Sequence, residues 1–330
     1  MAIAPSDLDS ALIAILADGE FHSGQQLGDQ LGVSRAAIHN HVEKLATLGL
    51  DIFRVTGKGY RLAKPLQLLN SEAVKANLLD ENQHVLMHLQ HVTGSTNDDL
   101  KRLLAEQNEL SAGTCVLAEM QTSGRGRRGK AWYSPFGSNL YLSMYWPLYQ
   151  GLNAAMGLSV AVGITLAEML AAAGIEGVSV KWPNDVYIQR KKVAGILVEL
   201  EGQATGEGQA IIGIGLNLGM PENQLAIDQP FTSINQHVPE ALDRNWWASE
   251  LINRCIGILQ THDKQGLQPL IALWRKYDHF YQQPVTLLLG QHEQQGIAQG
   301  IDEFGALLVQ QEDGIKRYFG GEISVRNPTR

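Results

Sequence analysis

Residues 1–62 carry three short apolar repeats with the spacing of α-helices, separated by turn residues. The apolar positions are Leu8, Leu12, Ile15 and Leu16 in the first repeat, Leu27 and Leu31 in the second, and Ile38, Val42 and Leu45 in the third. Ser23 and Ser34 are placed to cap the second and third helices, and Gly32 supplies the turn between them. This pattern predicts a helix-turn-helix whose third helix runs over residues 35–48.

The pattern then changes to two short strands over residues 51–55 and 60–62. They flank Thr56-Gly57-Lys58-Gly59, which predicts a β-hairpin "wing" tipped with Lys58. From Arg35 to Arg61 five cations oppose two acids, Glu43 and Asp51. The other acids of the module are expected outside the cationic surface; they are Asp7, Asp9, Asp18, Glu20 and Asp29.

The cationic surface, the turn glycine and the wing together favour DNA binding over a module used for protein contacts. The residues expected at the DNA are Gly24, Ser34, Arg35, Ala36, His39, Asn40, Lys44 and Lys58. One module makes few phosphate contacts, so tight operator binding would need a dimer that reads two half-sites.

Beyond the short linker at residues 63–66, strand-like runs predict a mixed sheet. The expected strands are residues 84–92, 114–120, 139–146, 178–185 with a break at Pro183, 186–188, 193–200 and 210–218. A helix is expected at 98–106, and residues 158–173 are interpreted as a buried amphipathic helix. Gly213 and Gly215 are expected to leave room for a ligand against the sheet.

From about Asp278 four glycine-punctuated strands predict a small β-barrel. The expected strands are residues 285–289, 296–301, 306–310 and 316–319. The chain of 330 residues is therefore expected to be α/β (α+β) with three domains: 1–64, 65–275 and 276–330.

Net charge, cysteine content and the absence of long apolar runs indicate the general class of protein and its cellular location. A net charge of −8 argues against a protein that coats nucleic acid along its whole surface. The two cysteines, Cys115 and Cys255, fit a reducing compartment and are expected to be buried apolar residues rather than nucleophiles. The N-terminus lacks a signal-peptide pattern, and no uninterrupted apolar run approaches about 18 residues, so a cytoplasmic protein without a membrane span is expected.

The stretch Gly124-Arg125-Gly126-Arg127-Arg128-Gly129-Lys130 carries the most specific chemistry. It holds four cations and three glycines, and no acid occurs between Glu119 and Glu168. Glycine allows close approach to a ligand, and arginine forks suit carboxylate and phosphate oxygens. The loop is expected to hold an anion, with a mobile basic loop as the alternative.

Two common phosphate motifs are excluded for this loop. A dinucleotide-binding G-x-G-x-x-G opens a helix and needs an acid about 20 positions later, whereas a strand follows here and no acid lies near position 150. A Walker loop requires Ser or Thr where Ala131 stands.

Other polar residues allow two interpretations each. Ser95, Thr96 and Asn97 can cap a helix or donate to a ligand. Lys192, at the start of an apolar strand, is either an edge residue that reaches water or a cation at the floor of a pocket. A metal cluster of His84, His88 and His91 is disfavoured because position 91 faces the other side of a strand.

These segments in their order resemble the biotin–protein ligase family. The matching residues are Ser95-Thr96-Asn97, Gln121 with the glycine-arginine loop, Lys181–Asp185, Lys192–Gly195 and Ile214–Asn217. With the winged helix in front, the chain looks like the bifunctional operon repressors and ligases of that family, from about Ser10 to about Arg326. The resemblance implies that the C-terminal β-barrel is SH3-like.

The resemblance implies a two-step reaction with ATP and biotin as substrates and Mg²⁺ held mainly by phosphates. Biotinyl-5′-adenylate forms first, and biotin then passes to a lysine of a biotin carboxyl carrier protein. It also implies repression of the biotin operon through operator DNA, by a homodimer that forms when the adenylate is bound.

The resemblance also implies roles for individual residues. Ser95, Thr96, Asn97 and Gln121 would bind the biotin rings; Arg125, Gly126 and Arg127 would fold over the adenylate as a lid; and Lys192 would bind the carboxylate and the attacked phosphate. Lys181 and Asp185 would lie near the phosphates and Mg²⁺, with Trp132, Asn217 and Arg326 at the adenylate or ATP. No residue is assigned as a metal site, and the loop 220–231 is expected to close over the ligand.

Three alternatives stay open at this point. They are a ligand-sensing transcription factor without catalysis, a lipoate-ligase relative, and a ligase whose helix-turn-helix is vestigial. Lys181 and Lys192 favour an enzyme over a sensor, because a sensor needs no phosphate chemistry.

Overall fold

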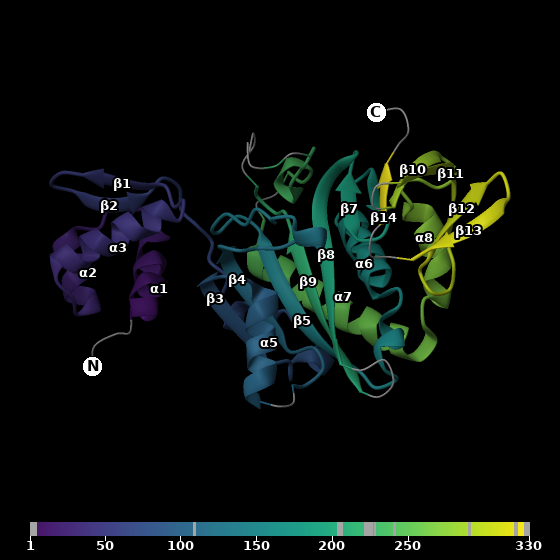
Figure 1. Ribbon diagram of the computed structural model, residues 1–330. Helices are drawn as coiled ribbons and strands as arrows, with labels where there is room; N and C mark the ends of the chain where they lie inside the picture. The colour runs from purple at the N-terminus through teal and green to yellow at the C-terminus, as the bar shows by residue number, and fades with distance from the viewer. Residues whose placement is uncertain are drawn as a thin grey trace.

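The computed structural model describes residues 5–107, 110–202, 207–220, 227, 229–239, 242–289, 292–319 and 323–326. The side chains of residues 5–7, 289 and 323–326 lie outside this description. The chain forms a winged helix, a central sheet covered by helices, and a small antiparallel sheet, in that order (Figure 1).

The winged helix agrees with the pattern of the sequence. Its elements are α1 (Pro5–Leu16), α2 (Gly24–Leu31), α3 (Arg35–Thr47), β1 (Ile52–Val55) and β2 (Gly59–Leu62). The Ser23 hydroxyl accepts from the Gln26 amide in a capping box, and the Ser34 hydroxyl accepts from the Ala37 amide. Gly32 ends α2 in the left-handed conformation with φ of 68°, as the turn requires.

The central sheet has seven strands in the order β3-β4-β5-β9-β8-β7-β6. The strands are β3 (Met87–Thr93), β4 (Cys115–Gln121), β5 (Leu140–Leu148), β6 (Val178–Lys181), β7 (Asp185–Ile188), β8 (Lys191–Gly202) and β9 (Gly208–Leu216). Only β3 and β4 pair in parallel among the described strands; the other neighbours are antiparallel. The expected mixed sheet is therefore confirmed, including the β7–β8 hairpin.

Helices cover both faces of this sheet. They are α4 (Ser71–Ala76), α5 (Thr96–Gln107), α6 (Leu158–Ala172), α7 (Arg244–Gln265) and α8 (Ile271–Tyr277). Short 3-10 turns lie at Asp80–Asn82, Arg127–Gly129, Leu152–Ala155, Ile234–Gln236 and Gln268–Leu270.

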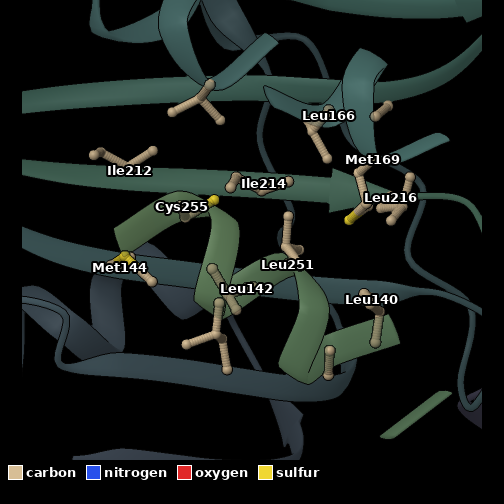
Figure 2. Close-up of a cluster of buried hydrophobic side chains, with 14 of the residues drawn as sticks. Leu140, Leu142, Met144, Leu166, Met169, Ile212, Ile214, Leu216, Leu251 and Cys255 are labelled. Atoms are coloured by element: carbon tan, nitrogen blue, oxygen red, sulfur yellow. The ribbon is translucent and has the colours of Figure 1, made fainter. Parts of the chain in front are cut away.

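The two sheet faces differ in what they bury. Figure 2 shows Met144 and Ile212 of the sheet on one face, with Leu166 of α6 and Leu251 of α7 packed in the same cluster. The alternate residues Tyr145 and Ile211 pack against α5 on the opposite face. Because side chains alternate along a strand, the α5 face also presents Gly213 and Gly215, where the candidate site lies.

The segment α6 departs from the expected amphipathic helix. Its residues enter two separate cores, with Val162 and Leu166 in one and Val160 and Ile164 in the other, so it is apolar on all sides. The segment Leu152–Ala172 is long and apolar enough to cross a membrane, but 56% of its most apolar window is buried within the protein. Burial between two cores is the behaviour of an internal helix.

The C-terminal piece is a five-stranded antiparallel sheet in the order β13-β12-β11-β10-β14. Its strands are β10 (Pro284–Leu289), β11 (His292–Ile301), β12 (Leu307–Gln311), β13 (Gly314–Tyr318) and β14 (Ile323–Arg326). The antiparallel strands expected there are confirmed, and β14 is an addition to them. Its core is shared with α6 and α8 through Val285, Leu287 and Trp274.

A buried ion pair within the central domain also holds the chain that follows the linker. Arg244 of α7 lies 2.7 Å from the Glu119 carboxylate, and the two side chains are 6% and 0% exposed. Arg244 also donates to the Gln67 carbonyl, and Glu119 accepts from the Leu69 amide. Phe136 packs with the apolar core of the winged helix. The chain that follows the glycine-arginine loop is thereby in contact with the winged helix.

Candidate functional site

A cavity of about 1130 Å³ opens on the α5 face of the central sheet. All three segments of the chain line it: Thr47–Gly49 at the end of α3, most of the central-domain residues singled out from the sequence, and Leu288 of β10. The central-domain members are Ser95, Thr96, Asn97, Gln121, Arg125, Gly126, Arg127, Trp132, Lys181, Asp185, Lys192 and Asn217. Folding therefore gathers residues that are spread over more than a hundred positions of the chain.

The glycine-arginine loop is a compact turn at the rim of this cavity. The Gly126 amide donates to the Lys130 carbonyl at 2.7 Å, and the Trp132 amide donates to the Gly124 carbonyl at 2.8 Å. A Cβ at Gly124 would stand 2.7 Å from both the Ser134 hydroxyl and the Trp132 carbonyl. Glycine is required at 124 because the two ends of the loop meet there.

Arg127 extends from the loop toward the segment Lys181–Asp185. Its guanidinium donates to the Asn184 side-chain oxygen at 3.2 Å. Burial, followed by repulsion from Arg128, lowers the pKa of Arg127, while Asp185 acts in the opposite direction. Arginine stays protonated in proteins, so Arg127 brings a desolvated positive charge to the cavity.

Asn184 is held for this contact by the strand beside it. Its side-chain amide donates to the Ile196 carbonyl at 3.0 Å, and its own backbone carbonyl accepts from the Ile196 amide at 2.9 Å. The preceding Trp182–Pro183 peptide bond is cis.

Lys192 lies at the cavity floor, paired with Asp185. Its Nζ is 2.8 Å from the Asp185 carboxylate and 5.2 Å from the centre of the Trp132 ring, and the side chain is 12% exposed. Strand β8 lies between β7 and β9, so Lys192 is not on an edge strand. The interpretation of an edge lysine that reaches water is wrong, because the neighbouring strands enclose it.

Gly213 and Gly215 do leave space above the sheet, but side chains fill it. A Cβ at Gly215 would stand 2.3 Å from the Trp132 ring, and a Cβ at Gly213 would stand 2.5 Å from the Asn97 side-chain oxygen. Both glycines nevertheless line the cavity, so the expectation that they leave room for a ligand stays a prediction. The glycines let two side chains of the site lie flat on the strands.

Thr96 and Gln121 form the polar wall at the start of α5. The Gln121 carbonyl oxygen accepts from the Thr96 amide at 2.9 Å and from its hydroxyl at 3.2 Å. The Gln121 amide donates to the Ser134 hydroxyl, which ties this wall to the end of the loop. Ser95 is buried beside them at 4% exposure.

Asn97 and the buried Ser143 continue this wall. Ser143 donates toward the Thr96 hydroxyl at 2.7 Å and toward the Asn97 side-chain oxygen at 2.5 Å. The sequence does not identify Ser143 and Ser134 as residues of the site. A serine inside a strand or loop carries no local signal that its hydroxyl will contact Asn97 or Gln121.

Apart from the Asp185 oxygen, which is ion-paired with Lys192, two buried polar atoms of the cavity wall have no hydrogen-bond partner among the described residues. They are Nε1 of Trp132 and the side-chain oxygen of Asn217. The Asn217 amide, in contrast, donates to the Thr232 carbonyl at 3.1 Å. An unsatisfied buried group costs about 1–3 kcal/mol, so one donor and one acceptor are kept here at a cost that a polar ligand can offset.

The remaining predicted ligand residues are placed as follows. Lys181 lines the cavity with Nζ 5.8 Å from the Tyr187 ring centre. Arg326 belongs to β14, opposite Thr286, and its side chain lies outside the described residues. In the predicted closing loop 220–231, residues 221–226 and 228 lie outside the description, whereas Ile227 and Phe231 line the cavity.

The thiols do not take part in the site. Burial raises the pKa of Cys115 and of Cys255 to about 12, so neither is a nucleophile near neutral pH. Among the described residues there is no cluster of three or more His, Cys, Asp or Glu that could hold a metal ion.

The predicted DNA surface occupies one side of the winged helix. Arg35, Ala36 and Asn40 are exposed along α3, and Lys58 lies 5.6 Å from the centre of the Phe21 ring at the wing. His39 is half-buried, with Nδ1 3.4 Å from the Tyr60 hydroxyl. The Ser34 hydroxyl is occupied in capping α3.

Gly24 lies beneath this surface rather than on it. It is buried, and a Cβ there would stand 3.3 Å from both the Arg35 side chain and the Tyr60 ring. Gly24 therefore makes room for Arg35.

One acid that was expected outside the cationic surface contacts it. Asp9 of α1 lies 2.5 Å from the Lys44 ammonium and 2.6 Å from the His41 ring nitrogen. The expectation for Asp9 is wrong because helix packing brings the N-terminal half of α1 beside the C-terminal half of α3. Lys44 is therefore ion-paired within the winged helix, and its contact with DNA stays a prediction.

Comparison with known proteins agrees with this architecture. The HTH domain family matches residues 9–61, the Biotin/lipoate A/B protein ligase family matches residues 89–217, and the Biotin protein ligase C terminal domain matches residues 282–326. The bifunctional ligase/repressor BirA of Salmonella typhimurium is 47% identical over 96% of this chain and 97% of its own length. The chain belongs to the bifunctional ligase/repressor family of biotin protein ligases.

The chain is also similar to more distant relatives and to solved structures. BirA of Bacillus subtilis is 32% identical over 94% of this chain and 95% of its own length. The biotin protein ligase from Aquifex aeolicus in complex with biotin and ATP superposes with a TM-score of 0.63 at 28% identity, covering 73% of this chain and 99% of that one. The expected family, fold class and ligase/repressor class are confirmed. The three matched ranges fall within the expected segments, whose limits remain predictions, as do the individual site roles.

Proposed function

We propose that the protein joins biotin to ATP as biotinyl-5′-adenylate and transfers the biotinyl group to a lysine of a biotin carboxyl carrier protein. The observation that carries the proposal is the arrangement at the cavity floor. Lys192 lies paired with Asp185 beneath the ring of Trp132, and Arg127 reaches in from the rim. Desolvated cations at fixed positions suit reactions that place negative charge on phosphoryl and acyl oxygens.

In the first step a biotin carboxylate oxygen forms a bond to the α-phosphorus of ATP, and the bond to pyrophosphate breaks. Lys192 holds the carboxylate and the attacked phosphate, so two anions approach one another beside a cation. Lys181, which lines the same cavity, lies near the phosphates. The protein contributes position and charge, and no side chain is covalently modified.

In the second step the neutral ε-amine of the acceptor lysine attacks the acyl carbon, AMP leaves with the bonding electron pair, and the amine loses a proton. The mixed anhydride is open to water, so retention of the adenylate matters between the steps. Arg127 and the loop Gly124–Gly129 serve as a lid that excludes water and slows escape.

Binding is divided among the remaining residues of the cavity. Ser95, Thr96, Asn97 and Gln121 take the biotin rings, while Trp132 stacks on adenine. The unpartnered oxygen of Asn217 accepts from the adenine amino group, and Arg326 serves the ATP phosphates.

Magnesium fits this site as a companion of the nucleotide. Mg²⁺ is usually bound by one or two carboxylates together with phosphate oxygens and water. Asp185 is the carboxylate of the described cavity that would hold it, in exchange for Lys192. When bound, the ion neutralises phosphate charge.

The winged helix makes the same protein a repressor. We propose that the adenylate-bound form is a homodimer that binds the operator of the biotin operon through α3 and the wing. Contact between Phe136, which follows the loop, and the winged-helix core supports a link between ligand and DNA. Two buried, free cysteines support a cytoplasmic location.

Biotin-dependent exchange of pyrophosphate into ATP tests the enzyme activity. The purified protein with Mg²⁺, ATP and biotin is expected to exchange label, and omission of biotin is expected to abolish exchange. Absence of exchange with biotin present would reject the ligase in favour of a non-catalytic sensor.

Replacing biotin with lipoate in the same assay separates the second acyl ligase class. The family that matches residues 89–217 includes biotin and lipoate ligases, whereas the family that matches residues 282–326 is that of the biotin protein ligase C-terminal domain. Exchange with biotin and none with lipoate is therefore expected. The reverse result would assign the site to lipoate.

A further inference from the structure

Two aromatic rings lie close to the ammonium of Lys181, one from the central sheet and one from the chain between α8 and β10. Its Nζ is 5.8 Å from the centre of the Tyr187 ring and 5.9 Å from the centre of the Phe280 ring. Both distances lie within the range, up to about 6 Å, in which a ring attracts a cation over its face. The ammonium is therefore in contact with two rings while its side chain lines the cavity.

The register of β6 and β7 brings Tyr187 to this place. Ser179 pairs with Tyr187, and Lys181 pairs with Asp185. Because side chains two positions apart lie on the same face of a strand, Ser179 and Lys181 share a face, and Tyr187 is the diagonal neighbour of Lys181. Diagonal neighbours in an antiparallel pair are within reach of long and aromatic side chains.

The third ring, that of His279, packs against both of the others. Strand β6 is an edge of the seven-stranded sheet, and the His279 amide donates to the Val180 carbonyl of that strand at 2.9 Å. The His279 Nδ1 lies 2.9 Å from the Ser179 hydroxyl. The centre of its ring is 5.1 Å from that of Tyr187 and 4.8 Å from that of Phe280, the latter edge-on at 85°. His279 thus connects the two rings and is anchored to the strand that carries Lys181.

We propose that Tyr187, His279 and Phe280 are positioning residues, which hold the ammonium of Lys181 in place for the phosphates of ATP. The proposal rests on the proposed function, since that function places Lys181 at those phosphates. The three rings are called the aromatic cage below.

The chemistry of the side chains explains why a cage is useful here. A lysine ammonium sits on a flexible stem of four carbons, so holding it before ATP binds reduces the freedom that is lost on binding. Burial, followed by the charges of Lys181 and Arg190, lowers the pKa of His279 to about 4. Near neutral pH the imidazole is therefore uncharged and does not repel the ammonium.

Two substitutions of Tyr187 test the cage in pyrophosphate exchange. Tyr187→Leu removes the ring, whereas Tyr187→Phe keeps it. Tyr187→Leu is expected to raise KM for ATP by about three- to tenfold, the range for one cation–π contact, and to leave KM for biotin unchanged. Tyr187→Phe is expected to match the wild type. Tyr149→Leu, which changes a tyrosine that is 76% exposed, is the matched control and is expected to alter neither constant.

The difference between the two substrates separates the cage from a general structural role. A structural defect would lower the thermal midpoint and raise KM for ATP and for biotin together, and that result would overturn the proposal. Equal KM values for ATP in Tyr187→Leu and Tyr187→Phe would also overturn it, because the ring would then have no effect on Lys181.

His279→Gln provides a second variant in case Tyr187→Leu does not fold. The glutamine amide keeps a polar group for Ser179 but has no ring to support Tyr187 and Phe280. A rise in KM for ATP of about two- to threefold is expected, with KM for biotin unchanged. An unchanged KM for ATP in folded His279→Gln would remove His279 from the cage and overturn the proposal.

A measurement without substrate keeps failure of the cage apart from failure of the proposed function. In protein labelled with ¹³C-lysine, ring currents move the ε-methylene NMR signal of a lysine that lies over aromatic rings upfield. The signal that disappears in Lys181→Met is that of Lys181. It is expected upfield in the wild type and in Tyr187→Phe, and nearer the position of exposed lysines in Tyr187→Leu.

The two assays have independent outcomes. A Lys181 signal at the same position in the wild type, Tyr187→Phe and Tyr187→Leu would overturn the cage even if the wild type exchanges pyrophosphate. If the wild type showed no biotin-dependent exchange, the proposed function would fail, and the NMR signal would still show whether the rings hold Lys181.

Discussion

The cavity and the DNA-facing surface of the winged helix both carry cations for anionic partners, but they hold them in different ways. In the cavity Lys192 is 12% exposed and paired with Asp185, and Arg125 is paired with Asp98. On the winged helix Arg35 stands exposed on α3 and Lys58 lies over an aromatic ring, and Lys44 is the cation there that is paired with a carboxylate, Asp9.

The difference follows from the size of the partner. A small ligand is enclosed, so its cations must lie in a desolvated site, where a neighbouring carboxylate keeps them charged. DNA is a long polyanion that exchanges counterions with a surface, so exposed cations are sufficient. Substitutions in the cavity should therefore cost much and depend little on salt, and those on the DNA surface should cost less and depend strongly on salt.

Lys192→Met should produce the largest effect. Removing the cation beside the attacked phosphate is expected to slow adenylate formation by about 10²–10³-fold, or about 2.7–4 kcal/mol, as for loss of one fixed donor to a developing anion. Biotin-dependent pyrophosphate exchange measures it. Lys191→Met, at the exposed neighbouring position, is the matched control, and equal losses in both variants would remove the special role of the cavity floor.

Arg35→Ala tests the DNA-facing surface of the winged helix. A loss of about 1–3 kcal/mol in binding to DNA from the upstream region of the biotin operon is expected, with pyrophosphate exchange unchanged. A gel-shift titration measures it, with Gln25→Ala on the exposed side of α2 as control. An unchanged affinity would move the recognition surface away from the start of α3.

The pKa of His279 reports how strongly the surroundings of its ring, next to Lys181, are desolvated. Burial, followed by the charges of Lys181 and Arg190, lowers the pKa of His279 to about 4. The folded state thus excludes a proton that the unfolded chain accepts near pH 6.5, so stability from this group is present above pH 6.5 and is lost as pH falls toward 4.

His279→Gln lacks this group. Its deficit in unfolding free energy relative to wild type is therefore expected to shrink by about 1–2 kcal/mol between pH 7.5 and 4.5, after allowance for partial exposure. The neighbouring Asp278, whose pKa burial raises to about 6, acts in the opposite direction but is present in both proteins. Urea denaturation followed by tryptophan fluorescence measures the deficit, with the exposed His84→Gln as control. A deficit in unfolding free energy that stays constant with pH would show that the His279 ring is hydrated.

Lys58→Ala should have the smallest effect and the clearest salt signature. Removing one phosphate contact is expected to lower the slope of log affinity against log salt by about one, with a uniform loss across DNA sequences. Titrations at several salt concentrations measure it, with Lys264→Ala on α7 as control. A loss of affinity that depends on the DNA sequence would indicate that Lys58 contacts bases rather than phosphates.

Much of the fold was predictable because it is encoded by near neighbours. Ser23, Ser34 and Gly32 cap their helices as their positions predict, and the strands of the central sheet lie within a few residues of the expected runs. The sequence predicts an amphipathic helix at α6, and this prediction is wrong because the burial of α6 between two cores depends on elements far away in the chain.

The sequence by itself determined the winged helix, the position of the glycine-arginine loop, the order of the motifs and hence the family. The tertiary structure alone decided which charges meet: Arg125 with Asp98 across 27 positions, Asn97 with Glu199 across 102, and Lys192 with Asp185 across a hairpin. It also decided that Trp132 and Asn97 fill the spaces above Gly215 and Gly213. The physical reason is range: caps, turns and periodicity act over a few residues, whereas ion pairs and packing depend on strand order and register, which bring distant residues within a few ångströms.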